Sequence, residues 1–142
     1  MLYRLRALFL CLVLLNTSAW ATPLKVNNNG SVTDLATGLI WQLQDDNISR
    51  SQAGALLYCS ELSLAGNSSW RLPSIKELSS IVDRRTSSPA IDHTVFQVNS
   101  SSSYWSGSAD ASNSDLAWRV VFDGGRTFSA DKTNVFYVRC VH

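Results

Sequence analysis

The chain has 142 residues, with 12 Lys and Arg, 11 Asp and Glu, and a formal net charge of +1. This near-neutral balance gives no global electrostatic field for nucleic acid or an anionic membrane, so we expect no nucleic-acid partner, and any charge-driven binding has to come from a local patch. The length suits one domain with a single core.

The first 21 residues have the pattern of a secretion signal. Arg4 and Arg6 precede the apolar run Ala7–Leu15, and Ala19-Trp20-Ala21 is the small-x-small pattern that signal peptidase recognises. The apolar run is about half of the roughly 20 residues that a membrane-spanning helix needs. We therefore expect a cleaved signal peptide, a periplasmic or secreted protein of bacterial type, and no transmembrane segment after cleavage.

Cleavage after residue 21 leaves a short polar leader over residues 22–29 and one domain over residues 30–142. It also leaves two cysteines, Cys59 and Cys140, in a chain that enters an oxidising compartment. A cysteine pair in that setting forms a disulfide more often than a metal or redox site. The sequence therefore predicts a Cys59–Cys140 disulfide, which contributes on the order of 4 kcal/mol in the chain-entropy account.

The chain after the leader begins with a predicted hairpin. The strand-like runs Val32–Asp34 and Leu39–Trp41 surround a turn in which Gly38 supplies a positive φ. Residues 49–62 then predict a helix, because Ser49 and Gln52 have the spacing of a capping box. Three apolar residues recur there at helical spacing, as expected for a core-facing stripe: Ala53, Leu56 and Leu57.

A second helix is expected after Pro73, where Ser74 and Glu77 form another capping box. Its apolar stripe consists of Ile75, Leu78, Ile81 and Val82. Residues 83–103 show little periodicity and end in a serine run, so they predict a long polar loop.

The last third of the chain is rich in strand formers. Residues 104–106 predict a short strand and residues 117–122 a stronger one, and the turn at Asp123-Gly124-Gly125 leads into another strand at 126–128. Residues 135–141 predict a long closing strand. The expected fold is α+β: two helices packed on small antiparallel sheets, N- and C-terminal strands adjacent, and long polar loops.

Several blocks of this sequence resemble the Lcl C-terminal domain family, and they cover nearly all of the chain after the signal, in order. The most specific are Trp70-Arg71-Leu72-Pro73 and Tyr137-Val138-Arg139-Cys140. The other blocks are 32–42, 55–59, 62–69, 74–78, 89–92, 104–106 and 117–120.

The resemblance implies a C-type-lectin-like fold in an exported bacterial protein. In the collagen-like member that names the family, this domain is associated with binding sulfated glycosaminoglycans. The present chain has no collagen-like Gly-x-x repeat. It also lacks the Glu-Pro-Asn, Gln-Pro-Asp and Trp-Asn-Asp motifs of animal C-type lectins, so calcium-dependent monosaccharide binding is not carried over.

Basic and aromatic residues are the candidate ligand contacts. Arginine side chains bind sulfate and carboxylate groups bidentately. The candidate contacts are Arg84, Arg85, Trp105, Arg119, Arg126 and Lys132. The alternative is a solvated surface in which Asp83, Asp123 and Asp131 neutralise the cations.

Other aromatic residues predict core positions, because each buries a large apolar area. We expect Trp41 and Trp118 in the core, and Trp105 either in the core or at the surface. Trp70 and Leu72 are expected to be buried, with Arg71 paired to a carboxylate or to backbone carbonyls.

Features of an enzyme or a metal site are sparse. His93 is the only internal histidine, and no Gly-x-Ser-x-Gly elbow is present, so we expect no enzymatic activity and no cofactor. Asp110, Asn113 and Asp115 are the only candidate calcium ligands, and their spacing matches no known calcium loop.

The sequence thus favours an exported binding module that recognises a glycan, with sulfated glycans among the candidates, or a surface protein. Residues 83–103 and 108–116 are the expected recognition loops. The alternative is a structural subunit of a periplasmic or surface assembly, in which the same loops contact other proteins.

Overall fold

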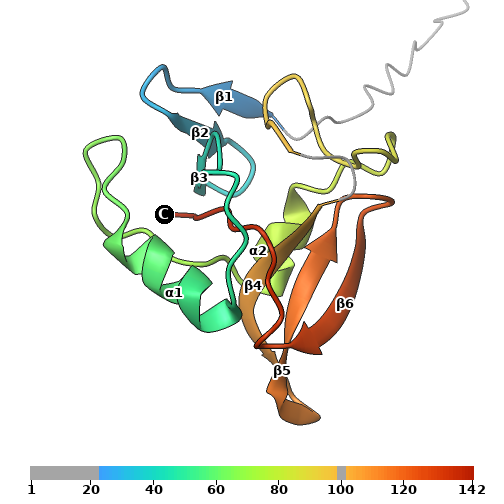
Figure 1. Ribbon diagram of the computed structural model, residues 1–142. Coiled ribbons are helices and arrows are strands. Elements are labelled where there is room, and N and C mark those ends of the chain that lie inside the picture. The colour runs from blue at the N-terminus through green and yellow to red at the C-terminus, as the bar shows by residue number, and fades with distance from the viewer. Residues whose placement is uncertain (1–22, 99–101) are drawn as a thin grey trace, which may run out of the picture.

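The computed structural model describes residues 23–98 and 102–142, so the predicted signal peptide lies outside the described residues. The described chain forms two three-stranded antiparallel sheets and two helices, which confirms the α+β class (Figure 1). The first sheet comprises β1 (Leu24–Val26), β2 (Ser31–Asp34) and β3 (Ile40–Gln42). The helices are α1 (Gln52–Glu61) and α2 (Ile75–Ser80), and the second sheet comprises β4 (Ser103–Asp110), β5 (Asn113–Val121) and β6 (Arg126–Asp131).

The first sheet contains the predicted hairpin. Strands β2 and β3 pair antiparallel, and Gly38 in their turn has a φ of +76°. Strand β1 lies inside the expected leader and pairs with β2, so part of the leader belongs to the fold. Lys25 and Val26 are exposed and only Leu24 packs against the core, so β1 is held mainly by backbone pairing and carries no alternating burial pattern that its sequence would reveal.

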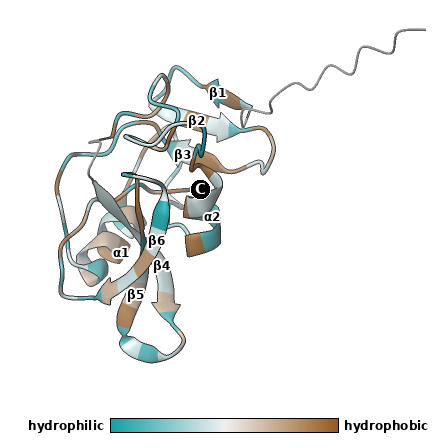
Figure 2. Cartoon of the chain, turned by 90° about the vertical axis from the view of Figure 1, so that its right-hand side faces the viewer, coloured by the Kyte–Doolittle hydropathy of each residue, from teal (hydrophilic) through white to brown (hydrophobic). Residues whose placement is uncertain are grey.

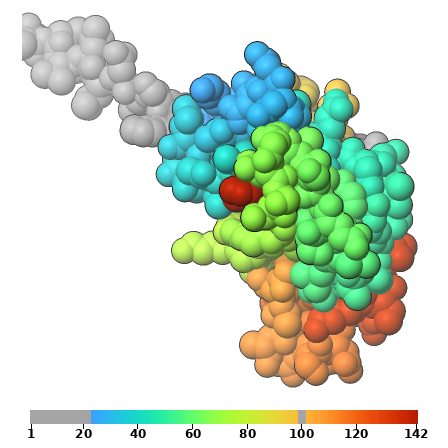
Figure 3. Space-filling view, turned by 90° about the vertical axis from the view of Figure 1, so that its left-hand side faces the viewer, coloured from blue at the N-terminus to red at the C-terminus, as the bar shows by residue number. Residues whose placement is uncertain are grey.

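The C-terminal end of the chain lies against the first sheet, as expected. The amides of Ile40 and Gln42 donate to the carbonyl oxygens of His142 and Cys140, each at 3.0 Å. Figure 3 shows the end of the chain, in red, between the blue N-terminal residues and the green residues of the middle of the chain. The N- and C-terminal parts of the domain are therefore neighbours in space.

Residues 135–141, here called the closing segment, do not form the long strand that was predicted. They make single bridges to separate partners: Phe136 to Arg50, Tyr137 to Tyr104, and Val141 to both Trp41 and Arg71. Because its backbone groups are divided among several elements, the segment pairs with none of them over consecutive residues. Its valine-rich sequence serves burial instead, since Val138 and Val141 are fully buried.

Helix α1 differs from its prediction in start and in orientation. Ser51, not Ser49, is the N-cap and accepts from the amide of Gly54 at 3.2 Å. Arg50 cannot join the helix because its amide and carbonyl both bond to Phe136. The buried positions are Gln52, Ala55 and Cys59, so the predicted core stripe of Ala53, Leu56 and Leu57 is wrong: it faces outward.

Helix α2 agrees with its prediction. Ser74 caps the helix, and both hydrogen bonds of the capping box with Glu77 are present. The carboxylate of Glu77 also receives two hydrogen bonds from Arg71, at 2.7 and 2.8 Å, which confirms the expected pairing of Arg71. Leu78 and Ile81 are buried, so the stripe packs into the core.

The second sheet lies between the two helices (Figure 2). On one face, Tyr104 and Val120 join the core cluster that contains Leu78 of α2. On the other face, Trp105 joins the cluster that contains Cys59 of α1. Strands β4 and β5 meet at a tight turn after Asp110, so residues 108–116 are mostly strand and not the polar loop that was expected.

The segment between α2 and β4 also departs from a simple polar loop. It has no helix or strand over residues 83–98, as expected, but Ala90, Ile91 and Phe96 are buried in the core. Its backbone is fixed where the amide of Ala90 donates to the carbonyl of Phe122 at 2.7 Å. The loop is therefore anchored, and all of its exposed residues are polar.

The predicted disulfide is present and links Cys59 of α1 to Cys140 of the closing segment, across 81 residues of sequence. Both cysteines are fully buried. Within the described residues, no helix is long and apolar enough to span a membrane.

The capping box of α2 predicts a pH-dependent contribution to stability. Hydrogen bonds from Arg71 and Ser74 lower the pKa of Glu77 from 4.5 to about 2. A carboxyl whose folded-state pKa is depressed stabilises the fold above its unfolded pKa and loses that contribution as the pH falls toward its folded pKa. We expect Glu77→Gln to lower the urea midpoint at pH 7, and the difference from the parent to shrink between about pH 4.5 and about pH 2. A difference that stays constant over this pH range would show that the charge of Glu77 contributes nothing.

Candidate functional site

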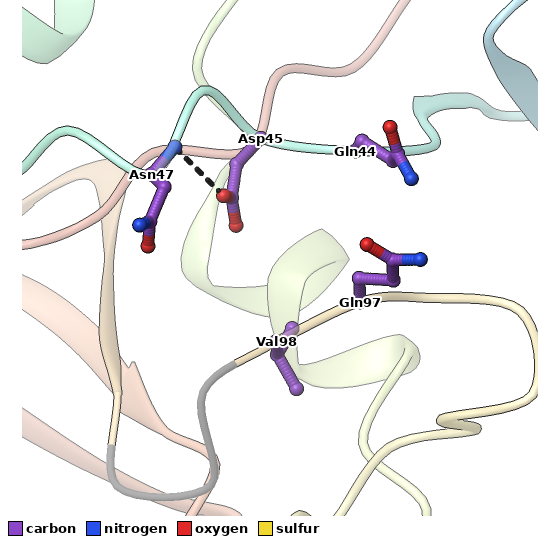
Figure 4. A pocket seen from close by; sticks show the side chains of 5 residues that line it. All are labelled: Gln44, Asp45, Asn47, Gln97 and Val98. Carbon is purple, nitrogen blue, oxygen red and sulfur yellow. Dashed lines mark hydrogen bonds between the residues drawn. The ribbon is translucent and has the colours of Figure 1, made fainter.

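A polar pocket of about 310 Å³ lies between the segment that follows β3 and the end of the 83–98 loop (Figure 4). Gln44, Asp45 and Asn47 line it from one side, and Gln97 and Val98 from the other. A parallel bridge between Gln44 and Gln97 brings the two segments together. Its volume is at the small end of the range for ligand pockets, which begins at about 300 Å³. We call it the carboxamide pocket.

The carboxylate of Asp45 is already engaged by the protein. One of its oxygens accepts from the amide of Asn47 at 3.0 Å. The other accepts from the hydroxyl of Tyr104 and from Arg139 at 3.3 Å. Burial raises the pKa of Tyr104, so its hydroxyl keeps the proton that it donates to Asp45.

Arg139 lies beneath the pocket and connects its two sides. The side chain is fully buried, and Nη1 donates to the carbonyls of Gln42 and Leu43 at 2.7 and 2.6 Å. Nη2 donates to the carbonyl of Gln97 at 2.8 Å as well as to Asp45. The positive charge of Arg139 offsets the negative charge of Asp45, so the base of the pocket carries no net charge.

Three carboxamides line the pocket, those of Gln44, Asn47 and Gln97, and Asn47 is already engaged by the protein. Gln44 and Gln97 are the two that remain for a ligand. Both residues are exposed, and neither side-chain amide makes a hydrogen bond to another described residue. Figure 4 shows the side chain of Gln97 extending toward the segment that carries Gln44. Each carboxamide offers an oxygen acceptor and two N–H donors, so the pair suits a ligand rich in hydroxyl or amide groups.

The predicted basic residues do not form one patch. Arg84 and Arg85 lie exposed in the 83–98 loop, and Arg85 is paired with Asp83 at 2.7 Å. Lys132 follows the far end of β6 and donates to the carbonyl of Ser114 at 2.6 Å. These cations are therefore spread over separate parts of the molecule, and two of them are already bonded.

Arg119 and Arg126 do come together, on one face of β5 and β6. Arg119 pairs in register with Phe128, and its guanidinium lies 5.5 Å from that ring and 4.6 Å from the ring of Phe136. The guanidinium of Arg126 lies 5.7 Å from the centre of the Phe128 ring. Desolvation lowers the pKa of Arg119, which is half-buried and also donates to Ser103 at 2.6 Å. We call this group the Phe128 face.

Trp105 is a core residue and not a ligand contact. It is fully buried, and its indole nitrogen donates to the carbonyl of Arg50 at 2.8 Å. A buried ring offers no surface for a sugar to stack on, so Trp105 is not a candidate ligand contact. Trp41 and Trp70 are buried as expected, whereas Trp118 is only half-buried.

The candidate calcium ligands close the turn between β4 and β5. One oxygen of Asp110 accepts from the amide and hydroxyl of Ser112, at 2.9 and 2.7 Å, and the oxygen of Asn113 accepts from the amide of Asp115 at 2.9 Å. In the described part of the chain, no group of three or more His, Cys, Asp or Glu side chains is placed to hold a metal ion. His93 is exposed in the 83–98 loop.

Sequence reasoning missed the carboxamide pocket because its members look unremarkable in the sequence. Asp45 belongs to a polar stretch that is typical of a solvated break. A usable signal was Arg139, since a charge inside the apolar run 137–141 requires a buried partner. The sequence alone does not say which acidic residue provides it.

Because Asp45 pairs with the buried Arg139, we expect its replacement to destabilise the fold much more than replacement of the neighbouring Asp46. Asp45→Asn leaves the charge of Arg139 buried without its counter-ion, and breaking a buried pair in this way costs about 3 kcal/mol or more. Asp46 pairs with Arg50 at the surface, so Asp46→Asn is the matched control, with an expected loss within about 1 kcal/mol. Urea unfolding of both variants measures the two losses. Equal losses would contradict the role assigned to Asp45.

Comparison with known proteins agrees with the resemblance seen in the sequence. A family model for the Lcl C-terminal domain matches residues 30–142. No curated protein matches the chain. The matched range includes both helices, the second sheet, the disulfide and every residue of the carboxamide pocket. The chain therefore belongs to the Lcl C-terminal domain family.

Proposed function

We propose that this chain is an exported, non-enzymatic binding module that recognises a glycan through the carboxamide pocket. The observation that carries the proposal is the pair of unengaged amides, Gln44 and Gln97, above a base whose charges offset each other. Planar amides bond well to sugar hydroxyls, because they donate and accept from fixed directions.

The charge of the pocket favours a neutral glycan over a sulfated one. Asp45 and Arg139 cancel, and the pocket has no other ionisable lining residue among those described. Elsewhere, the described Arg50, Arg71 and Arg85 are also paired with carboxylates. The other described Lys and Arg residues form no ion pair, but none of them lines this pocket.

We place this binding module in the cell envelope or outside the cell. Membership of the Lcl C-terminal domain family, the disulfide and the secretion-signal pattern all support it. The C-type-lectin-like fold, a periplasmic or secreted location, and binding without catalysis, calcium or another cofactor belong to the same proposal.

A second candidate, an acidic glycan, is favoured by the Phe128 face. Phe128 is 41% exposed, and the guanidiniums of Arg119 and Arg126 lie 5.5 and 5.7 Å from the centre of its ring. An exposed phenylalanine offers a stacking surface for the apolar face of a sugar, and an arginine beside it can bind a sulfate or carboxylate substituent.

A glycan array with neutral and sulfated members tests both candidates. We expect binding to neutral glycans that is insensitive to salt and to calcium chelation. Each lost hydrogen bond costs about 1 kcal/mol, so the double variant Gln44→Ala and Gln97→Ala should bind on the order of 10-fold more weakly or worse. Arg126→Ser should leave this binding unchanged.

The opposite pattern would favour the second candidate. Salt-sensitive binding to sulfated glycans that Arg126→Ser abolishes and the glutamine variants retain would place recognition on the Phe128 face. An array without any bound glycan would overturn both candidates and leave the alternative of a structural subunit.

A further inference from the structure

The outward face of α1 is apolar, although nothing in the described chain covers it. Leu56 and Leu57 are 46% and 57% exposed, and together with Ala53 they form an i, i+3, i+4 stripe. Such a stripe normally faces a core, and the solvent side of a helix normally carries charges. Ile48 and Val135, beside the start of the helix, are also largely exposed. Four of the seven exposed large apolar residues of the described chain therefore gather on this side.

A groove of about 580 Å³ runs along this helix. Leu57, Tyr58 and Val135 provide its apolar lining. Gly54 has no side chain there, and the hollow that it leaves is bordered by Arg50 and Ser51, each with a side-chain atom 3.4 Å from the position that a Cβ would take. Figure 3 shows this green surface open toward the viewer. A protruding leucine and a hollow thus lie one helical turn apart on the same helix.

The charges of α1 are arranged unfavourably for an isolated helix. The helix has no acidic residue in its first turn and no basic residue in its last turn. Its only charged residue is Glu61, at the C-terminal end, where the helix dipole is negative. Arg50, near the N-terminal end, is engaged by Asp46. Both ends of the helix would therefore gain from an opposing charge.

We propose that the occupant of this groove is a second copy of the chain, with the two α1 helices packed antiparallel about a two-fold axis. In this arrangement Leu57 of each copy enters the hollow at Gly54 of the other, since a two-fold interface uses the same patch twice. The antiparallel direction also brings Glu61 of each copy to the N-terminal end of the opposite α1, where a negative charge is stabilising. This one pairing thus buries the apolar stripe, fills the hollow at Gly54 and places an opposing charge at the N-terminal end of each α1.

This inference does not rest on the proposed glycan function. No residue lines both the groove and the carboxamide pocket, so different variants test the two proposals. A dimer would present two pockets on one particle, and two linked sites strengthen binding to a polymeric glycan without any new contact.

Sedimentation equilibrium of the purified protein, from micromolar to millimolar concentration, tests the proposal. We expect a reversible monomer–dimer equilibrium. Leu57→Asp and Glu61→Arg should each raise the dissociation constant on the order of 10-fold or more, because one places a charge in the contact and the other opposes the helix dipole. Leu35→Asp is the matched control: Leu35 is 60% exposed in the β2–β3 turn, so this variant should dimerise like the parent.

Near-ultraviolet circular dichroism of each variant verifies that it is folded. A protein that is monomeric at every concentration would overturn the proposal. A dimer that persists in folded Leu57→Asp, or that Leu35→Asp weakens equally, would place the contact elsewhere and overturn it too.

Discussion

The guanidinium of Arg139 is fully buried and donates to the carbonyls of Gln42, Leu43 and Gln97, with Asp45 as its counter-ion. Both terminal nitrogens of this guanidinium are hydrogen-bonded, whereas the buried Nε has no partner. The buried charge is therefore stabilised by these acceptors and by its counter-ion, so the segments that supply these oxygens must stay in place. Those segments are the two sides of the carboxamide pocket. The pocket is therefore shaped by a residue that does not line it.

Arg139 holds this position because the closing segment around it is fixed from several directions. Cys140, the next residue, is bonded covalently to α1, and the neighbouring backbone groups bond to β3, to β4 and to Arg71. The segment thus connects both sheets and the first helix without being a strand of either sheet. The disulfide also sets which face of α1 points to the core. Cys59 must face inward to reach Cys140, and this leaves Leu56 and Leu57 on the outer face.

Local signals in the sequence were mostly reliable, although the capping-box spacing of Ser49 and Gln52 misplaced the start of α1, whose N-cap is Ser51. Non-local expectations mostly failed, apart from the Cys59–Cys140 disulfide and the neighbouring N- and C-terminal parts of the domain. The capping box of Ser74 and Glu77 and the hairpin turn at Gly38 depend on residues a few positions apart, and both are present. The inward face of α1 and the conformation of residues 135–141 depend on partners tens of residues away, so periodicity and strand propensity misjudged them. The pocket was hidden for the same reason, because Gln44 and Gln97 meet only after the chain has folded around Arg139.

Native-state hydrogen exchange tests this account most directly. The amides of Ile40, Gln42 and Trp105 belong to different sheets, and each donates to a carbonyl of residues 137–142. If the closing segment holds the two sheets together, these three amides open with the same free energy, equal to that of global unfolding. Opening of the Ile40 and Gln42 amides at a much lower free energy than that of Trp105 would contradict it, since the first sheet would then detach while the rest of the domain stayed folded.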